Sequence, residues 1–354
     1  MRFQPGPPGP HRRSYLAGHR RSDDHPTSLA LIREAHRDVT RRGRAIVYWG
    51  LGGSVAAAAG PVIGGVLTQL DWRLNFFVNL PVGAAALLML FRTAPSPRRP
   101  RPFDWFGQVS AVLALSSLTY GIIEGAAVGY ESPGILILFG VCAASAVAFV
   151  LAQVRGEHPM VPSDLFRSPT VSIALAIALV TMAAFYGVVL VLSLYFQQQR
   201  GATPLTTGLL FLPMTGLVAL LNPLTARLMV RYGKIAMIVA GQLLLVMGLV
   251  GLWLLTADSP TPLVALVMVP VGVGGSFTAP PIVALVLDHV TTEIAGTASG
   301  VINTVLQLGG SLSVAVYGAL LNGHDFTDGL RLGLGATVVV LVLLAVSPPL
   351  LSAR

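Results

Sequence analysis

The feature that most constrains this chain is a series of long apolar runs that contain almost no charged side chains. Ten such runs follow one another, at 46–70, 74–92, 105–127, 134–153, 170–196, 205–229, 234–255, 262–287, 296–321 and 330–350. A helix needs about 20 apolar residues to cross the hydrocarbon core of a bilayer. Only 11% of all residues are charged, whereas about 25% are charged in a typical soluble domain. The sequence therefore predicts an all-α integral membrane protein, a polytopic bundle of about ten transmembrane helices.

The distribution of lysine and arginine predicts how the chain is oriented in the membrane. Cytoplasmic loops of membrane proteins carry an excess of these two residues. If the N-terminus is cytoplasmic, only Arg73, Arg200 and Arg331 of the 23 basic residues lie on the outer side. We therefore expect a multi-pass protein with both termini in the cytoplasm.

The net charge of +8 does not indicate a nucleic-acid partner. Nucleic-acid binding requires a folded basic surface, whereas residues 1–27 have the Arg, Pro, His and Gly bias of a disordered tail. An enzyme is also disfavoured, because the seven histidines and the single cysteine, Cys142, form no catalytic or metal-binding pattern. We expect no catalytic residue and no metal site.

Small residues surround a proline in the first apolar run, whose centre reads Gly60-Pro61-x-x-Gly64-Gly65. Gly and Pro destabilise a helix interior in water. In a bilayer, small faces let two helix backbones approach closely, and neighbouring helices tolerate a proline kink. The turn that follows contains the string WRLNFFVNLPVG, with Trp72, Arg73, Asn79 and Pro81.

Both strings resemble motifs of the major facilitator superfamily. The glycine–proline core resembles motif C, the antiporter motif in helix five. The string that follows resembles the loop into helix six of the fourteen-helix drug/proton antiporters. Two linked motifs at the expected spacing indicate membership of that family.

Later parts of the chain extend the resemblance. Residues 222–234 resemble a second copy of motif A, in which Arg227, Arg231 and Gly233 fit and Val230 stands where an acidic residue is usual. Residues 195–216 and 296–318 resemble the passage from helix nine to helix ten and the thirteenth helix, respectively. The chain is thus similar to helices five to fourteen of the family.

The resemblance implies a major facilitator fold that is truncated. We expect four regions: a basic cytoplasmic or disordered segment at 1–45, the last two helices of the N-terminal bundle at 46–92, two extra linker helices at 105–153 and a C-terminal six-helix bundle at 170–351. Helices one to four, with the first motif A loop and an acidic residue associated with proton coupling, would be lacking. A misread start before Ser28 and a natural short form are the two explanations, and translating the upstream DNA in the other frames distinguishes them.

Polar side chains within the apolar runs are the candidates for lining a translocation pathway. These are Tyr186, Asn222, Asn303 and Gln307. The last two are four residues apart and share a helix face. Each residue also fits a simpler role as a hydrogen bond between helices. The run at 262–287 contains prolines and a glycine cluster, which indicate either a broken helix near a pathway or a kink tolerated in lipid.

The family resemblance implies a function. It implies a transporter of the bacterial inner (plasma) membrane that exports hydrophobic or cationic drug-like compounds in exchange for protons, by alternating access. The expected partners are a small-molecule substrate, protons and the lipid bilayer, with no cofactor beyond the proton gradient. Two alternatives stay open: a truncated, non-transporting membrane protein and an exporter of one specific metabolite. The sequence names neither a substrate nor an oligomeric state.

Overall fold

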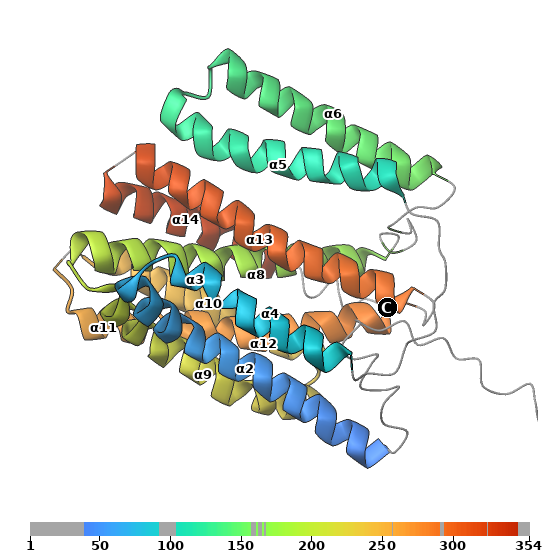
Figure 1. The fold of residues 1–354 in the computed structure, drawn as a ribbon, viewed down its shortest axis with the longest axis horizontal. Helices are drawn as coiled ribbons and strands as arrows, with labels where there is room; N and C mark the ends of the chain where they lie inside the picture. Colours follow the sequence, from blue (N-terminus) through green and yellow to red (C-terminus); the bar gives the residue numbers. More distant parts are fainter. Residues whose placement is uncertain are drawn as a thin grey trace, which may run out of the picture.

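A computed structural model provides the fold and describes residues 39–91, 104–156, 161, 165, 168–256, 258–290, 294–323 and 325–345. These residues form helices and no strand. The helices, labelled in Figure 1, are α2 (Val39–Leu70), α3 (Leu74–Phe77), α4 (Asn79–Leu90), α5 (Trp105–Val128), α6 (Pro133–Arg155), α8 (Pro169–Leu194), a π-helix (Tyr195–Gln199), α9 (Pro204–Tyr232), α10 (Lys234–Leu254), α11 (Thr261–Val267), α12 (Val269–Asp288), α13 (Ala295–Gly323) and α14 (Phe326–Ala345).

Prolines begin several of these helices, and glycines follow their ends. Pro133, Pro169 and Pro204 lie in the first turns of α6, α8 and α9, where a backbone N–H is not needed. Gly129 and Gly233 follow α5 and α9 with φ angles of 91° and 86°, values that favour glycine. The chain therefore reverses within a few residues between successive antiparallel helices.

Eight helical segments of the described residues are long and apolar enough to cross a membrane. They comprise α5, α6, α8 with the π-helix, α9, α10, α11 with α12, α13 and α14. The other two predicted spans correspond to α2 and to α3 with α4, whose apolar segments Val55–Leu70 and Leu74–Met89 are shorter. The prediction of an all-helical, multi-pass membrane protein is confirmed, and the described residues provide eight segments of full spanning length.

The helix predicted at 262–287 is interrupted at a single residue. Met268 separates α11 from α12, and Pro270 then lies in the first turn of α12. The Pro280-Pro281 pair lies inside α12 without ending it. The break therefore falls where a missing proline N–H costs least.

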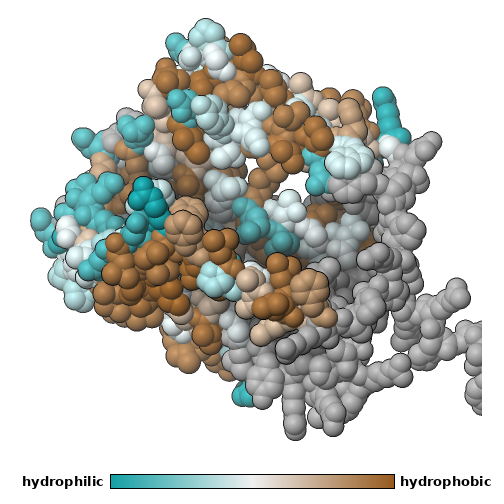
Figure 2. Space-filling view, in the orientation of Figure 1, coloured by the Kyte–Doolittle hydropathy of each residue, from teal (hydrophilic) through white to brown (hydrophobic). Residues whose placement is uncertain are grey.

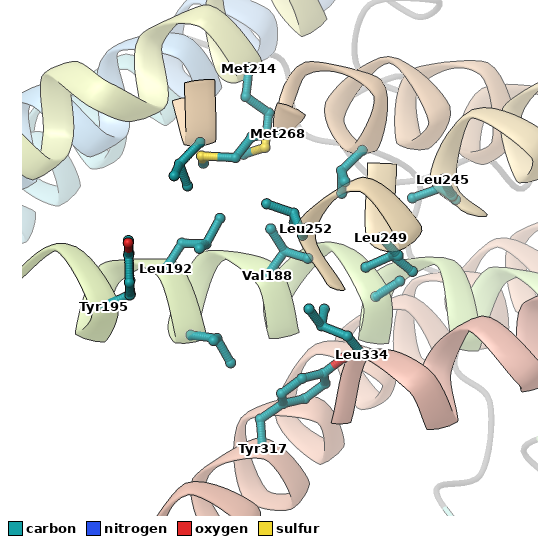
Figure 3. Packing of buried hydrophobic residues seen from close by; sticks show 14 of the residues in the cluster. Val188, Leu192, Tyr195, Met214, Leu245, Leu249, Leu252, Met268, Tyr317 and Leu334 are labelled. Carbon is teal, nitrogen blue, oxygen red and sulfur yellow. The ribbon is translucent and has the colours of Figure 1, made fainter. Parts of the chain in front are cut away.

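The core lies among α8 to α14, where two clusters of buried residues join the helices. The first cluster, drawn in Figure 3, includes Val188, Leu192, Leu249, Leu252 and Leu334. The second cluster lies towards the beginning of α8 and the end of α12, and includes Ile177, Ile238 and Ile282. Helix α8 contacts α10, α12, α13 and α14, and α10 also packs against α12 and α14.

The earlier helices pack around this bundle. Helix α2 packs against α9, and the α5–α6 hairpin reaches the bundle through the contact of α5 with α13 (Figure 1). Residues 79–89 of α4 are exposed throughout. In Figure 2, hydrophobic side chains cover much of the flank, and hydrophilic ones gather at the end where the turn after α2 lies.

Candidate functional site

The glycine–proline centre of α2 lies against the beginning of α9 at very short range. A Cβ atom on Gly65 would lie 2.6 Å from the carbonyl oxygen of Pro204 and 3.0 Å from the Cα atom of Leu205. From the other side, a Cβ atom on Gly208 would lie 3.2 Å from the Cα atom of Val62. The two backbones therefore meet directly, as small residues permit in membranes. We call this contact the α2–α9 seam.

Pro61 and Thr215 add a polar contact to the α2–α9 seam. Pro61 has no N–H to donate to the carbonyl of Ala57. In the same turn, the Thr215 hydroxyl of α9 donates to the carbonyl of Ala58 at 3.4 Å and to that of Phe211 at 3.2 Å. The turn that proline weakens is therefore the turn to which α9 supplies a donor.

The other two glycines of the motif do not belong to the seam. A Cβ atom on Gly60 would meet nothing within 4 Å, and one on Gly64 would meet only the Asn75 Oδ1 atom, at 3.8 Å. Sequence reasoning grouped all four positions, whereas the structure assigns the close approach to Gly65 and Pro61. The matched pair of Gly60 and Gly65 therefore provides an internal control.

Arg73 is held within the turn after α2. Its guanidinium carbon lies 5.0 Å from the ring centroid of Trp72, and its Nη1 atom lies 3.7 Å from a carboxylate oxygen of Asp71. Its backbone N–H donates to Asp71 at 2.9 Å. All three residues are exposed, so these contacts shape the turn and bury little surface.

The asparagines of the same turn tie α2 to α4. The Asn75 amide donates to the Thr68 hydroxyl at 2.7 Å, and the Asn79 amide donates to the Asn75 carbonyl at 3.2 Å. Pro81 follows in the first turn of α4, where it needs no hydrogen-bond partner for an N–H. The residues of the predicted loop motif therefore form a turn that is held by hydrogen bonds within residues 68–79.

The loop that resembles motif A joins α9 to α10. Gly233 has φ 86°, which permits the reversal. Arg227 and Arg231 are exposed, and Arg231 lies 5.3 Å from the Tyr232 ring centroid. Val230, at the position of the usual acid, is 87% exposed. The two arginines therefore face outward from the bundle end.

Sequence reasoning missed the charge pair beside this loop. The Nζ atom of Lys234 forms an ion pair with Asp288 at the end of α12 and donates to the Ala284 carbonyl at 3.2 Å. Lys234 directly follows Gly233 of the motif, and Asp288 ends an apolar run, which were the available signals. The pair holds α10 and α12 together at the end opposite the turn after α2.

Three of the four candidate lining residues lie on the neighbouring helices α8 and α13. Tyr186 is 41% exposed, and its ring lies 5.5 Å from that of Phe185. A Cβ atom on Gly310 of α13 would lie 2.9 Å from Tyr186 Cδ2. Gln307 lies about one helical turn before Gly310 and Asn303 one turn further, and both are exposed. Tyr186 thus lies against Gly310 of α13, the helix that also carries Gln307 and Asn303.

Asn222 lies elsewhere. It is half-buried on α9, a helix whose main contacts are with α2 and α12. The four candidates are therefore divided between an α8–α13 group and a separate position on α9.

Close glycine contacts also lock α8 to α13. A Cβ atom on Gly309 would lie 3.1 Å from the carbonyl carbon of Leu179. One turn later, the Ser313 hydroxyl donates to the Ala183 carbonyl at 2.5 Å. These contacts set α8 and α13 side by side, with Gly309 level with Leu179 and Ser313 level with Ala183.

Tyr317 of α13 extends this close packing to α14. Cβ atoms on Gly187 of α8 and Gly333 of α14 would lie 2.5 Å and 2.6 Å from the Tyr317 ring. The Tyr317 hydroxyl is hydrogen-bonded to Thr337 at 2.8 Å, and Thr337 donates to the Gly333 carbonyl at 2.8 Å. A large aromatic residue thus fits between two glycines. Figure 3 shows Tyr317 beside Leu334.

A buried amide lies on the other side of α8. Gln242 of α10 has no exposed surface, and its Nε2 atom donates to Thr181 at 2.9 Å and to Thr278 at 3.5 Å. Its Oε1 atom has no partner among the described residues. This network joins α8, α10 and α12 and was not anticipated from the sequence.

A cavity of about 340 Å³ opens at the end of the bundle where α8 becomes the π-helix. Its wall includes Val188 and Leu192 of α8, Leu252 of α10 and Leu334 of α14, with Arg200 at its mouth. Figure 3 shows Val188 next to Leu252, with Leu192 nearby along α8. Within the described residues, no cluster of three or more metal-ligating side chains occurs.

A helical membrane bundle with glycine-packed interfaces defines the class of this protein, and comparison with known proteins gives its family. Residues 25–314 match the profile of the Major Facilitator Superfamily. The chain belongs to that superfamily. The match is to a family of transporters and indicates no catalytic family.

Several curated relatives are named for resistance or export. The chain is 34% identical over 301 residues to the multidrug resistance protein Stp of Mycobacterium tuberculosis, covering 83% of this chain and 55% of that protein. It is 33% identical over 306 residues to the tetracenomycin C resistance and export protein of Streptomyces glaucescens, covering 84% and 56%. It is 30% identical over 306 residues to a methylenomycin A resistance protein of Bacillus subtilis, covering 84% and 64%. The chain thus spans a little over half the length of the first two relatives and under two thirds of the third.

Proposed function

We propose that this chain takes part in proton-coupled export of hydrophobic or cationic drug-like compounds by alternating access. The observation that carries the proposal is the α2–α9 seam. It joins a helix expected in the N-terminal bundle to one expected in the C-terminal bundle, with backbones in direct contact at Gly65 and Gly208. Two helices that meet through close backbone contacts can separate and rejoin as rigid bodies, which alternating access requires.

The α8–α13 side of the bundle is the proposed lining of the pathway. Tyr186 offers an exposed aromatic ring, and Gln307 and Asn303 offer amides without a full charge. An aromatic face attracts an organic cation, and amides orient polar groups of a ligand. Coupling to protons is proposed from the family resemblance and uses no bound cofactor.

A second candidate is export of one specific metabolite. It is favoured by the names of two relatives, each of which refers to a single antibiotic, tetracenomycin C or methylenomycin A. A third candidate, a membrane protein that does not transport, predicts the same interfaces without export. Competition between substrates separates the first two candidates.

The test is expression of the full 354-residue chain in an efflux-deficient bacterium, with ethidium accumulation measured with and without a proton uncoupler. Membrane insertion is verified by fractionation. The proposal expects low accumulation that rises when the uncoupler is added. Gly208→Val should abolish export, because it forces the seam apart, whereas Gly60→Val should leave it unchanged.

Each outcome decides between the candidates. Uncoupler-sensitive export that many cationic dyes inhibit supports the multidrug reading. Export of a single compound without competition supports the metabolite reading. A well-inserted chain that exports neither ethidium nor the two named antibiotics overturns transport by this chain alone.

A further inference from the structure

The cavity at the end of α8 is polar at its mouth and apolar inside. Its volume of about 340 Å³ lies within the range of roughly 300–1,000 Å³ that small-molecule sites occupy. The inner wall consists of buried side chains such as Val188, Leu192 and Leu252. Five polar lining residues are exposed at the mouth: Gln199, Arg200, Thr256, Asp258 and Thr327. A ligand that fits both parts is amphipathic, with its apolar part inside.

The π-helix places a fixed cation at the mouth. The backbone N–H of Arg200 donates to the Tyr195 carbonyl at 3.1 Å, a bond across five residues that sets Arg200 above Tyr195. The guanidinium Nε donates to the Tyr195 hydroxyl at 2.8 Å, and Nη2 donates to the Ser259 carbonyl at 2.5 Å. The guanidinium carbon lies 5.3 Å from the Tyr195 ring centroid. Single-turn π-helices are rare and occur often at functional sites.

An anion lies at the same mouth without neutralising this cation. Asp258 directly precedes Ser259, whose carbonyl holds Arg200. Both charged side chains line the cavity, yet no ion pair joins them in the described part of the chain, where the ion pairs are Arg73–Asp71 and Lys234–Asp288. The mouth therefore presents two opposite charges that are held apart.

We propose that this cavity binds a zwitterionic amphiphile with one apolar chain inside, its anionic group on Arg200 and its ammonium group on Asp258. Guanidinium groups bind phosphate oxygens through charge-assisted hydrogen bonds. Asp258 opposes a purely anionic head group, and Arg200 opposes a purely cationic one. A phosphoethanolamine head group on an acyl chain satisfies both charges and the apolar wall.

The site is distinct from the proposed pathway. Tyr186 projects on the α13 side of α8, whereas Val188 and Leu192 face the cavity. An occupied cavity would brace the end of α8 that begins the π-helix. The inference does not depend on transport by this chain.

The test measures equilibrium binding of three probes with a 12-carbon chain and one probe without a chain to the full protein, purified in maltoside micelles, by scintillation proximity. The probes are lysophosphatidylethanolamine, lysophosphatidylglycerol, dodecyltrimethylammonium and, to distinguish a lipid from a soluble head group, phosphoethanolamine without a chain. Unmodified protein should prefer the lysophosphatidylethanolamine to each of the others by about tenfold or more.

Three variants separate the contributions to binding. Asp258→Asn breaks no hydrogen bond seen in the structure, and it should lower affinity for the zwitterion about tenfold without weakening binding of the anionic probe. Arg200→Gln should weaken the binding of both the zwitterionic and the anionic probe. Leu330→Trp, which fills the half-buried wall, should weaken all chain-bearing probes. Arg331→Gln is the matched control, because Arg331 is exposed beside the site and does not line it.

Several results would overturn the proposal. Equal affinity for the zwitterionic and anionic probes would mean that Arg200 alone binds the head group. An Asp258→Asn variant with unchanged affinity for the zwitterionic probe would mean the same. Equal binding of phosphoethanolamine without a chain, or no effect of Leu330→Trp, would exclude the apolar interior as part of the site.

Discussion

Helices α6 and α8 have the same apolarity and different surroundings. The best membrane-spanning window of α6 has a mean hydropathy of 2.7 with 6% of it buried in the protein, whereas that of α8 has 2.6 with 50% buried. Hydropathy therefore reports which solvent a helix tolerates, and in lipid an apolar side chain gains little by moving from lipid to protein. What distinguishes α8 is the partners that approach it closely, at Gly187 and through Gly309 of α13.

The glycines of the two regions follow the same distinction. On α6, Cβ atoms at Gly134 and Gly140 would meet nothing within 4 Å. In the bundle, Cβ atoms at Gly187 and Gly309 would collide with α13 and α8. Glycine thus marks a helix contact only where a partner backbone or ring lies against it, and composition alone does not identify those positions.

The strongest challenge to this comparison is the same substitution in each kind of helix. Gly309→Leu adds a side chain where even a Cβ atom would lie 3.1 Å from the Leu179 carbonyl carbon. We expect it to lower the free energy of unfolding by about 3 kcal/mol, at the upper end for overpacking. Gly140→Leu, the control on α6, should stay within about 0.5 kcal/mol. Denaturant titration in mixed micelles measures both, and equal losses would contradict the comparison.

The α2–α9 seam extends the comparison to a helix outside the bundle. Gly208→Val should separate α2 from α9 at a cost of about 2 kcal/mol. The separation of the two helices is measured as the yield of cross-linking between Ala58→Cys and Thr215→Cys by a short bismaleimide, in a Cys142→Ser background. The yield should fall severalfold.

Gly60→Val is the matched control for the seam, because Gly60 faces open space. Its cross-linking yield should equal that of the parent. If Gly60→Val reduced the yield as much as Gly208→Val, the whole motif rather than its Gly65 face would form the contact.

A smaller effect is expected where the α5–α6 hairpin is fastened to the bundle. The Gln153 amide donates to an Asp104 carboxylate oxygen at 3.0 Å, and its Oε1 atom accepts from the backbone N–H of Val161 at 2.9 Å. Val161 packs against the second buried cluster. Gln153→Leu should weaken this link by about 1 kcal/mol. Amide hydrogen exchange at Gly107, whose N–H bonds to Asp104, should become faster.

The neighbouring exposed residue Gln108 provides the control for this link. Gln108→Leu should leave exchange at Gly107 unchanged. Unchanged exchange in Gln153→Leu would mean that the hairpin is held by α5–α13 packing alone.

Much of the fold could be predicted from the sequence because a bilayer restricts what an apolar run can form. Runs of about 20 residues must become helices, since every backbone group has to be bonded internally. The motif strings lie at the turn around Arg73 and at the loop around Gly233. Their local hydrogen bonds and φ angles depend on neighbouring residues only.

The sites were harder to predict because they depend on register between distant segments. Gly65 and Gly60 look alike in sequence, and only the position of Pro204 separates them. The π-helix and Arg200 bring Asp258 to the same cavity from a loop more than fifty residues away. No local pattern in either segment encodes that meeting, so the cavity was not predicted.

The smallest expected effect tests whether a buried polar group changes the comparison between packed and lipid-facing helices. Gln242→Leu removes the bonds to Thr181 and Thr278, but Thr278 already donates to the Gly274 carbonyl at 2.8 Å. The change also removes an Oε1 atom without a partner in the described chain. Hydrogen bonds between membrane helices average about 0.6 kcal/mol, so we expect a loss of about 0.5 kcal/mol. A double-mutant cycle with Thr181→Val measures the coupling. A coupling above about 2 kcal/mol would show that polar bonds, rather than glycine contacts, hold α8 in the bundle.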